Sequence, residues 1–185
     1  MKRFLFVLAV LVLVPHMIVK AAPPGFPPEV NSAFEKAGLR LLNAKQPTLD
    51  FNLRLVGGGY VRLSDLKGKV VFLNFWATWC PPCRSEMPSM EVLYQRFKAQ
   101  GLEFVAVDIG EEHDDVKKFM SQFNLSFPAA LDESGDVSDN YGIGSIPATY
   151  IVGRDGNIII STIGSRKWDT PEMIAAFDAL LRSGQ

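Results

Sequence analysis

Residues 70–88 read VVFLNFWATWCPPCRSEMP, and this stretch decides the fold. Val70–Trp76 is apolar throughout except for Asn74, and such a run predicts a central strand in a sheet with helices on each side. Apolar residues then recur at helical spacing, at Met87, Met90, Tyr94 and Phe97. They predict a helix from about Pro82. Both cysteines of the chain therefore lie between a buried strand and the first turn of a helix.

The Cys80-Pro81-Pro82-Cys83 motif is the candidate reactive site. The unpaired amides and the positive dipole at a helix start stabilise a thiolate, so they should lower the pKa of Cys80. Cys80 could then attack a disulfide, and Cys83 could resolve the mixed disulfide that results. Pro81 and Pro82 restrict the turn between the two sulfur atoms. A redox site is therefore the leading interpretation.

Other interpretations of the two cysteines are weaker. A purely structural disulfide between them would close too small a loop to be the main stabiliser of a domain of this size. A tetrahedral zinc site needs further ligands, and the chain has only His16 and His113 as histidines. Covalent haem attachment requires a histidine after the second cysteine, where Arg84 stands. We therefore expect neither a metal nor another cofactor.

The segments before the motif predict a helix and a hairpin. Apolar residues at helical spacing predict a short helix over residues 30–41. Alternating residues over 49–55, followed by Gly57–Gly59 and residues 60–63, predict a β-hairpin.

The segments after the motif complete an α/β pattern. They predict a strand over 104–109, a helix over 116–123 with Asp114 or Asp115 as its N-cap, and paired strands over 148–152 and 157–160. The last helix should begin at Pro171 with Thr170 as its N-cap. The element order predicts a mixed sheet flanked by helices on both faces.

Composition limits the kinds of partner. The chain has 185 residues, with 19 Lys and Arg against 20 Asp and Glu, so its formal net charge is −1. Because it has no basic excess to neutralise phosphates, nucleic acid is not expected as a main partner. Two cysteines also rule out a scaffold held by several disulfides.

The N-terminus is typical of a secretory signal peptide. Met1–Arg3 is basic, Phe4–Val14 is an unbroken apolar run, and Ala21-Ala22 ends a small-residue cleavage zone. The alternative is an uncleaved membrane anchor, although the apolar segment is short for a span. We therefore expect a signal peptide or anchor over 1–22, a Pro-rich spacer with the short helix over 23–47, and one domain over 48–185.

Two motifs in the sequence resemble those of a known family. NFWATWCPPCRSEMP at 74–88 and GIGSIPATYIVGRDGNI at 142–158 resemble the thioredoxin fold, and specifically its TlpA/ResA-like extracytoplasmic branch. The resemblance covers residues from about 48 onward. It implies that Pro147 is a cis proline beside the disulfide and that the backbone of Ile146 pairs with an incoming substrate strand. We also expect Trp79, with Pro81 and Pro82, to form part of the substrate surface, and Trp76 to lie in the core.

Two departures from cytoplasmic thioredoxin bear on the chemistry. Asn74 stands where that protein buries an aspartate, so another group must handle the proton at Cys83. Glu86 is the candidate because it lies three residues after Cys83 on the same helix face, and the TlpA/ResA-like branch carries a glutamate there. A solvated acid near a helix start is the alternative. The chain is also longer between Glu111 and Tyr141, which resembles the central α/β insertion of this branch.

The resemblance implies a periplasmic thiol–disulfide oxidoreductase that reduces disulfides in exported proteins, with apocytochrome c as one client. Its other partner would be a membrane thiol reductase that donates electrons, because the periplasm is oxidising. Contact with the membrane is expected only through the N-terminal segment, if that segment is uncleaved. The alternatives are an oxidant that introduces disulfides and a non-catalytic peptide-binding module.

Overall fold

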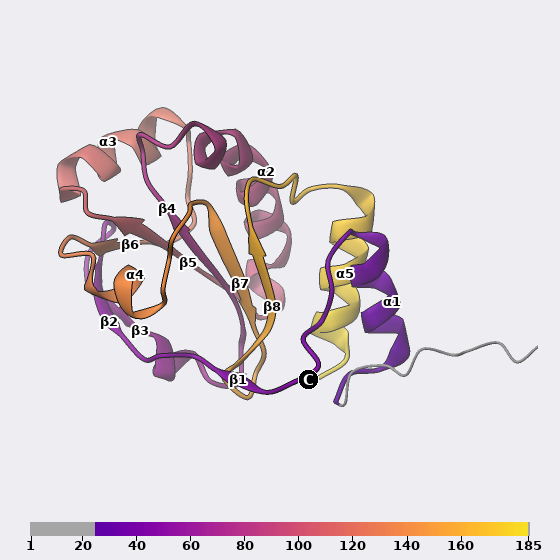
Figure 1. The fold of residues 1–185 in the computed structure, drawn as a ribbon. Coiled ribbons are helices and arrows are strands. Elements are labelled where there is room, and N and C mark those ends of the chain that lie inside the picture. Colours follow the sequence, from indigo (N-terminus) through magenta and orange to yellow (C-terminus); the bar gives the residue numbers. More distant parts are fainter. Residues whose placement is uncertain (1–24, 185) are drawn as a thin grey trace, which may run out of the picture.

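The computed structural model describes residues 25–184, so the expected signal peptide lies outside the described residues. Within this range, eight strands form one mixed sheet (Figure 1). The strands are β1 (Gln46–Pro47), β2 (Asn52–Leu55), β3 (Tyr60–Arg62), β4 (Val70–Trp76), β5 (Leu102–Ile109), β6 (Ala129–Asp132), β7 (Ala148–Val152) and β8 (Asn157–Ile163). Their order across the sheet is β1-β8-β7-β4-β5-β6-β2-β3.

Strand β4 is central, as its apolar sequence predicts. It pairs in parallel with β5 and antiparallel with β7, and all seven of its residues are buried. The predicted hairpin is present as the antiparallel pair β2 and β3. The predicted pair after the motif is present as β7 and β8. These pairings place the residues after β4 at one end of the sheet, beside the start of β7.

Helices cover the sheet on both faces, as predicted, but unevenly. One core cluster takes side chains from α1 (Pro28–Lys36), α2 (Pro81–Phe97), α3 (His113–Gln122) and α5 (Pro171–Arg182). The cluster on the opposite face includes side chains from the hairpin strands and is covered by the short helix α4 (Asp136–Asn140) and a 3-10 turn over Leu63–Leu66. A second 3-10 turn, Lys98–Gln100, follows α2. The long helices therefore all lie on the face to which α2 brings the cysteines.

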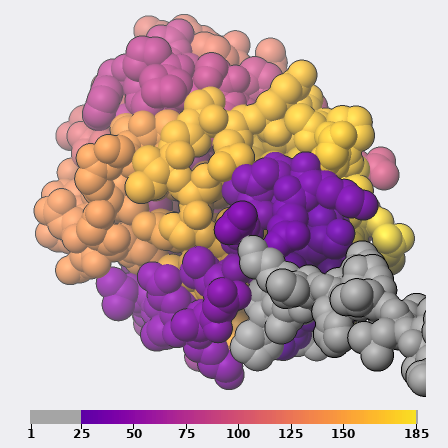
Figure 2. All heavy atoms as spheres, turned by 45° about the vertical axis from the view of Figure 1, so that its right-hand side comes forward, coloured from indigo at the N-terminus to yellow at the C-terminus, as the bar shows by residue number. Residues whose placement is uncertain are grey.

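Helix α1 packs against α5. The Phe34 and Phe177 rings meet edge to face at 5.6 Å, and Val30 and Phe34 are fully buried. Figure 2 shows the indigo residues of this N-terminal helix lying against the yellow C-terminal part of the chain. Residues near the start of the described chain thus complete the core beside α5.

Two predicted helix boundaries are wrong. Helix α1 ends at Lys36 and not near residue 41, because Gly38 turns the chain with a left-handed φ of +74°. Helix α3 begins at His113 with Glu112 as its N-cap, so Asp114 and Asp115 lie inside its first turn. Negative charges in that turn favour the helix whether or not they cap it. The predicted cap of α5 is correct, since the Thr170 side chain accepts a hydrogen bond from the Met173 amide at 3.2 Å.

The predicted α/β insertion between Glu111 and Tyr141 consists of α3, β6 and α4. Strand β6 adds to the sheet in parallel beside β5. The sequence did not predict β1, β6 or α4 as separate elements. Strand β1 has two residues, β6 has four and reads AALD, and α4 has five. Segments this short do not show a periodicity.

Candidate active site at the start of helix α2

Cys80 and Cys83 form a disulfide at the start of α2. Cys80 is the N-cap residue, and its sulfur accepts a hydrogen bond from the Cys83 backbone amide at 3.3 Å. Cys80 is 3% exposed, whereas Cys83 is fully buried. Cys80 is therefore less open than its position at a helix start suggests, but it retains more contact with solvent than Cys83 does. An amide aimed at its sulfur would also favour a thiolate there.

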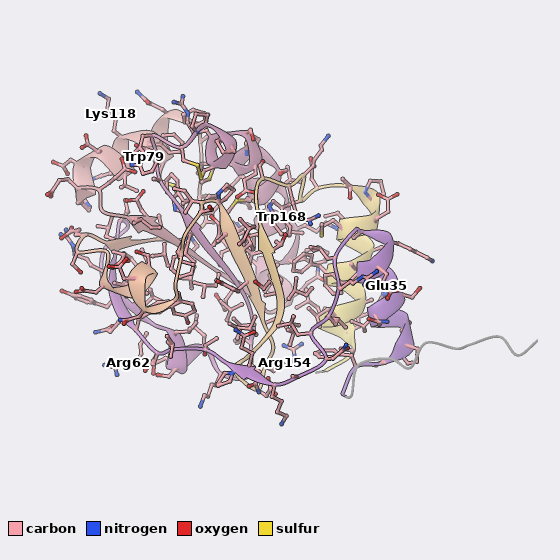
Figure 3. The ribbon with its side chains drawn as sticks, in the orientation of Figure 1. Glu35, Arg62, Trp79, Lys118, Arg154 and Trp168 are labelled. Carbon is pink, nitrogen blue, oxygen red and sulfur yellow. A yellow bond between two sulfur atoms is a disulfide. The ribbon has the colours of Figure 1, made fainter. Side chains whose placement is uncertain are left out.

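The residues around the cysteines provide a surface with exposed apolar groups. Trp79 is 66% exposed and lies at the end of the molecule where the disulfide is found (Figure 3). Pro81 and Pro82 occupy the first positions of α2 and are exposed. Trp76, by contrast, is fully buried in the core, as the sequence indicates. A partner that reaches Cys80 would meet Trp79 and the two prolines first.

The start of β7 lies on the other side of the disulfide. The Ile146–Pro147 peptide bond is cis, as the resemblance implies, and the Ile146 carbonyl oxygen lies 3.8 Å from the Cys80 sulfur. The Gly164 amide donates to the Pro147 carbonyl oxygen at 2.8 Å, which ties this turn to the end of β8. The structure thus brings Cys80, Ile146 and Pro147 together, and the pairing of Ile146 with a substrate strand stays a prediction.

Glu86 is buried behind the disulfide and is not a solvated surface acid. It is 1% exposed, and three donors surround its carboxylate. Asn74 Nδ2 donates to Oε1, while the Arg166 backbone amide and Trp168 Nε1 donate to Oε2, each at 3.1 Å. Glu86 therefore links β4, α2 and the segment between β8 and α5.

Burial raises the pKa of Glu86 above its ordinary value. The hydrogen bonds from Arg166, Trp168 and Asn74, together with the positive charge of Arg166, act in the opposite direction because they stabilise the ionised form. The raised pKa moves the group toward the range in which a carboxyl can exchange a proton near neutral pH.

Sequence reasoning missed two residues of this site. Ile163, at the end of β8, is 69% exposed and pairs in register with Ala148, the residue after Pro147. It was missed because the predicted strand stopped at residue 160. Trp168 was missed because nothing local shows that its indole meets a carboxylate 82 residues earlier.

Residues 25–184 contain no cluster of three or more His, Cys, Asp or Glu side chains that could hold a metal ion. Within the same residues, no helix has the length and apolar character needed to cross a membrane.

Comparison with known proteins gives consistent results. Residues 44–161 match the model of the AhpC/TSA family. The chain is 38% identical over 155 residues to the thiol-disulfide oxidoreductase ResA of Bacillus subtilis (strain 168), covering 84% of each chain. It is 43% identical over 109 residues to the ResA of Bacillus thuringiensis (strain Al Hakam), a match that covers 59% of this chain. That match spans 63% of the relative, which is less than two thirds of its length.

A solved structure is similar over much of the described fold. It is a Chlorobium tepidum protein provisionally named thiol:disulfide interchange protein DsbE, and it is 34% identical with a TM-score of 0.68. The match covers 76% of this chain and 99% of that one.

Proposed function

The chain belongs to the AhpC/TSA family, alongside the proteins named thiol-disulfide oxidoreductase ResA, and from this membership we propose that it exchanges thiols and disulfides with other proteins outside the cytoplasm. The observation that carries the proposal is the disulfide at the N-cap of α2, with the Cys83 amide donating to the Cys80 sulfur. A sulfur held at a helix start is suited to exchange, because the same amides stabilise it as a thiolate leaving group.

In the proposed reaction the dithiol form of the protein reduces a client. The Cys80 thiolate attacks one sulfur of a client disulfide, and the other client sulfur leaves as a thiolate that takes up a proton. The Cys83 thiol loses its proton and attacks the Cys80 sulfur, which releases the second client thiol. Two electrons pass to the client, and the protein is left with the Cys80–Cys83 disulfide. Glu86 is proposed to take part in moving the proton at Cys83.

The client is proposed to bind on the surface around the disulfide. Trp79, Pro81, Pro82 and Ile163 would contact its side chains, and the backbone of Ile146 with Pro147 would align its strand. The proximity of the Ile146 carbonyl to the Cys80 sulfur, 3.8 Å, supports this arrangement. An extended client segment there would bring its disulfide to the more accessible of the two cysteines.

We further propose that the protein works in the periplasm as a reductant. The basic and apolar start of the sequence supports export. An oxidising compartment requires an electron donor, for which a membrane thiol reductase is suited. The proposed clients are exported proteins with disulfides, such as apocytochrome c whose cysteine pair is oxidised. The resemblance to the TlpA/ResA-like branch supports these assignments.

Trapping tests the order of the two cysteines. Cys83→Ser should accumulate mixed disulfides with client proteins, because the bond that Cys80 forms can no longer be resolved. Cys80→Ser is the matched control and should trap none. Equal trapping by both variants would reject the assignment.

A redox titration tests the direction of the reaction. A reductant should have a potential below that of the client disulfide, and each difference of about 30 mV changes the exchange equilibrium tenfold. A potential well above that of the client would support the oxidant instead. Absence of any exchange with a protein disulfide would support a binding module.

A further inference from the structure

Two acidic side chains lie behind the loop that joins β4 to α2. Asp108, near the end of β5, is in register with Trp76 and has no exposed surface. Glu111 follows β5 and is half-buried. The proposed exchange reaction makes no use of either carboxyl group.

Glu111 holds the residue that precedes Trp79. Its two carboxylate oxygens accept hydrogen bonds from Thr78, one from the backbone amide and one from the hydroxyl group. The Cys80 amide donates to the Ala77 carbonyl oxygen at 3.2 Å and closes the same turn. Because hydrogen bonds to a charged acceptor are strong, Glu111 fixes the backbone from which Trp79 and Cys80 extend.

Asp108 lacks a donor of its own. Neither of its carboxyl oxygens is paired with a hydrogen-bond donor in the part of the chain that the structure describes. Glu111 is the titratable group beside it, whereas Asp132 is in register with Ile109 on the opposite face of the sheet, where it accepts hydrogen bonds from the amides of Val137 and Ser138. A buried carboxylate without donors is costly, whereas a protonated acid can itself donate to a neighbouring carboxylate.

The pKa of Asp108 is consistent with a protonated group. Burial, followed by the neighbouring Glu111 carboxyl group and the more distant charge of Asp132, raises the pKa of Asp108 to about 9. At neutral pH the Asp108 side chain is therefore a neutral acid.

We propose that Asp108 and Glu111 are positioning residues that share one proton: Asp108 donates its O–H to Glu111, and the ionised Glu111 holds Thr78 and the loop that carries Trp79 and Cys80. The inference depends on the proposed function in one respect only, that the loop is held in place in order to meet a client. When Asp108 loses its proton, two negative charges face each other. Glu111 is then displaced, and Thr78 loses its fixed acceptor.

Collisional quenching of tryptophan fluorescence by acrylamide tests this in the oxidised full chain. Trp76 and Trp168 are fully buried and Trp79 is 66% exposed, so quenching reports on Trp79. Neither cysteine titrates while the disulfide is intact. We expect the quenching constant to rise with pH through a one-proton transition near pH 9.

Three variants show which side chain causes the change in quenching. Asp108→Asn carries an amide that can donate to Glu111 as the protonated acid does, so it should show no transition and the neutral-pH quenching throughout. Glu112→Gln removes an exposed carboxylate next in sequence, and it should keep the transition. Thr78→Val keeps the branched shape but loses the hydroxyl donor, so its quenching at neutral pH should already exceed that of the wild type.

A transition that persists in Asp108→Asn would overturn the inference. So would a carboxyl-carbon NMR signal showing Asp108 ionised at neutral pH in the wild type, a measurement that needs no variant to fold. A protein that shows the Asp108 transition but exchanges no disulfide would refute only the proposed function. An active protein without the transition would refute only this inference.

Discussion

Glu86 and Asn74 form a hydrogen-bonded pair that can be kept when Glu86 loses its negative charge. Asn74 Nδ2 donates both to Glu86 and to Thr149 Oγ1, at 2.9 Å in the second case, while Asn74 Oδ1 is buried with no partner among the described residues. In Glu86→Gln the new amide oxygen can keep the bonds from Arg166 and Trp168. A flip of the Asn74 amide would then let its oxygen accept from the new amide nitrogen, with the Thr149 hydroxyl donating in turn.

Glu86→Gln is therefore expected to fold and to lose only the ionisable group. Client disulfide reduction should slow by about tenfold or more if Glu86 handles the proton at Cys83. The pH profile of thiol alkylation should move to lower pH, because removing a nearby negative charge makes a thiolate easier to form. Both are measured with the reduced protein. Glu103→Gln, at the far end of β5, is the control, and profiles identical to wild type in both assays would reduce Glu86 to a structural role.

Ile163 offers a test of the client surface. Because Ile163 is 69% exposed, Ile163→Ser should leave stability nearly unchanged. If a client packs on it, KM for a protein disulfide should rise about tenfold, as expected for an apolar contact worth about 1.4 kcal/mol. The rate of reaction with a small dithiol should not change.

Tyr60→Ser is the matched control for Ile163, because Tyr60 is also 69% exposed but begins β3 at the opposite edge of the sheet. An equal effect of both substitutions on KM would argue against a client surface around Ile163.

The residues of the site differ in how far the sequence can predict them. Cys80, Cys83 and Trp79 lie in one local motif, and the Ile146–Pro147 pair has a recognisable context before a strand. The donors to Glu86 and the contact of Glu111 with Thr78 join residues that are far apart in the chain. Such contacts depend on which strands become neighbours, and no local pattern encodes that.

The elements were predictable where the sequence has a long periodicity or a cap. Strand β4 has seven buried residues, and α2 has a full apolar face, so both were recognised. Strand β1 has two residues and α4 has five, and their stability comes from pairing with β8 and packing near β6. Elements of this length are determined by tertiary contacts and not by propensity.

The N-cap of α5 allows a test at the scale of a single helix, namely of how much one cap contributes to stability. Thr170→Ala removes the hydrogen bond to the Met173 amide and should lower the free energy of unfolding by about 1 kcal/mol. Urea denaturation measures the change. Ser161→Ala, at an exposed position of β8, is the control and should cost less than about 0.5 kcal/mol. A cost at Thr170 no larger than at Ser161 would contradict the cap.

At the scale of the whole molecule, the sheet separates two apolar clusters. The larger one joins α1, α2, α3 and α5 around Trp76 and Trp168, and the smaller one lies on the opposite face around Phe75. Trp76 and Asp108 lie on the larger side, so the buried acid is part of the core that supports the cysteines. Its ionisation should therefore affect global stability as well as the active-site loop.

Asp108→Asn should change how stability depends on pH. The pKa of this carboxyl is 3.8 ordinarily and about 9 in the folded protein, so between these values the folded chain holds a proton that the unfolded chain has released. The stability that protonation of Asp108 gives the folded wild type is therefore present in full below about pH 4 and is lost progressively up to about pH 9. The variant has no such loss.

The stability difference in favour of Asp108→Asn should thus grow with pH, by at most about 1.4 kcal/mol per pH unit. Urea denaturation at several pH values measures it. Asp139→Asn, which alters an exposed aspartate in α4, should run parallel to wild type. If Asp108→Asn also runs parallel, the carboxyl is ionised in the folded protein.

The contacts of Glu86 have a consequence for the divergence of related sequences. A carboxylate buried at this position is tolerated only while Asn74 and the Trp168 indole supply donors to it. A lineage that replaced Trp168 with a residue lacking an N–H group would leave the charge short of a partner, and selection would then favour loss of the acid. The three positions are therefore expected to covary, although 94 residues separate the first from the last.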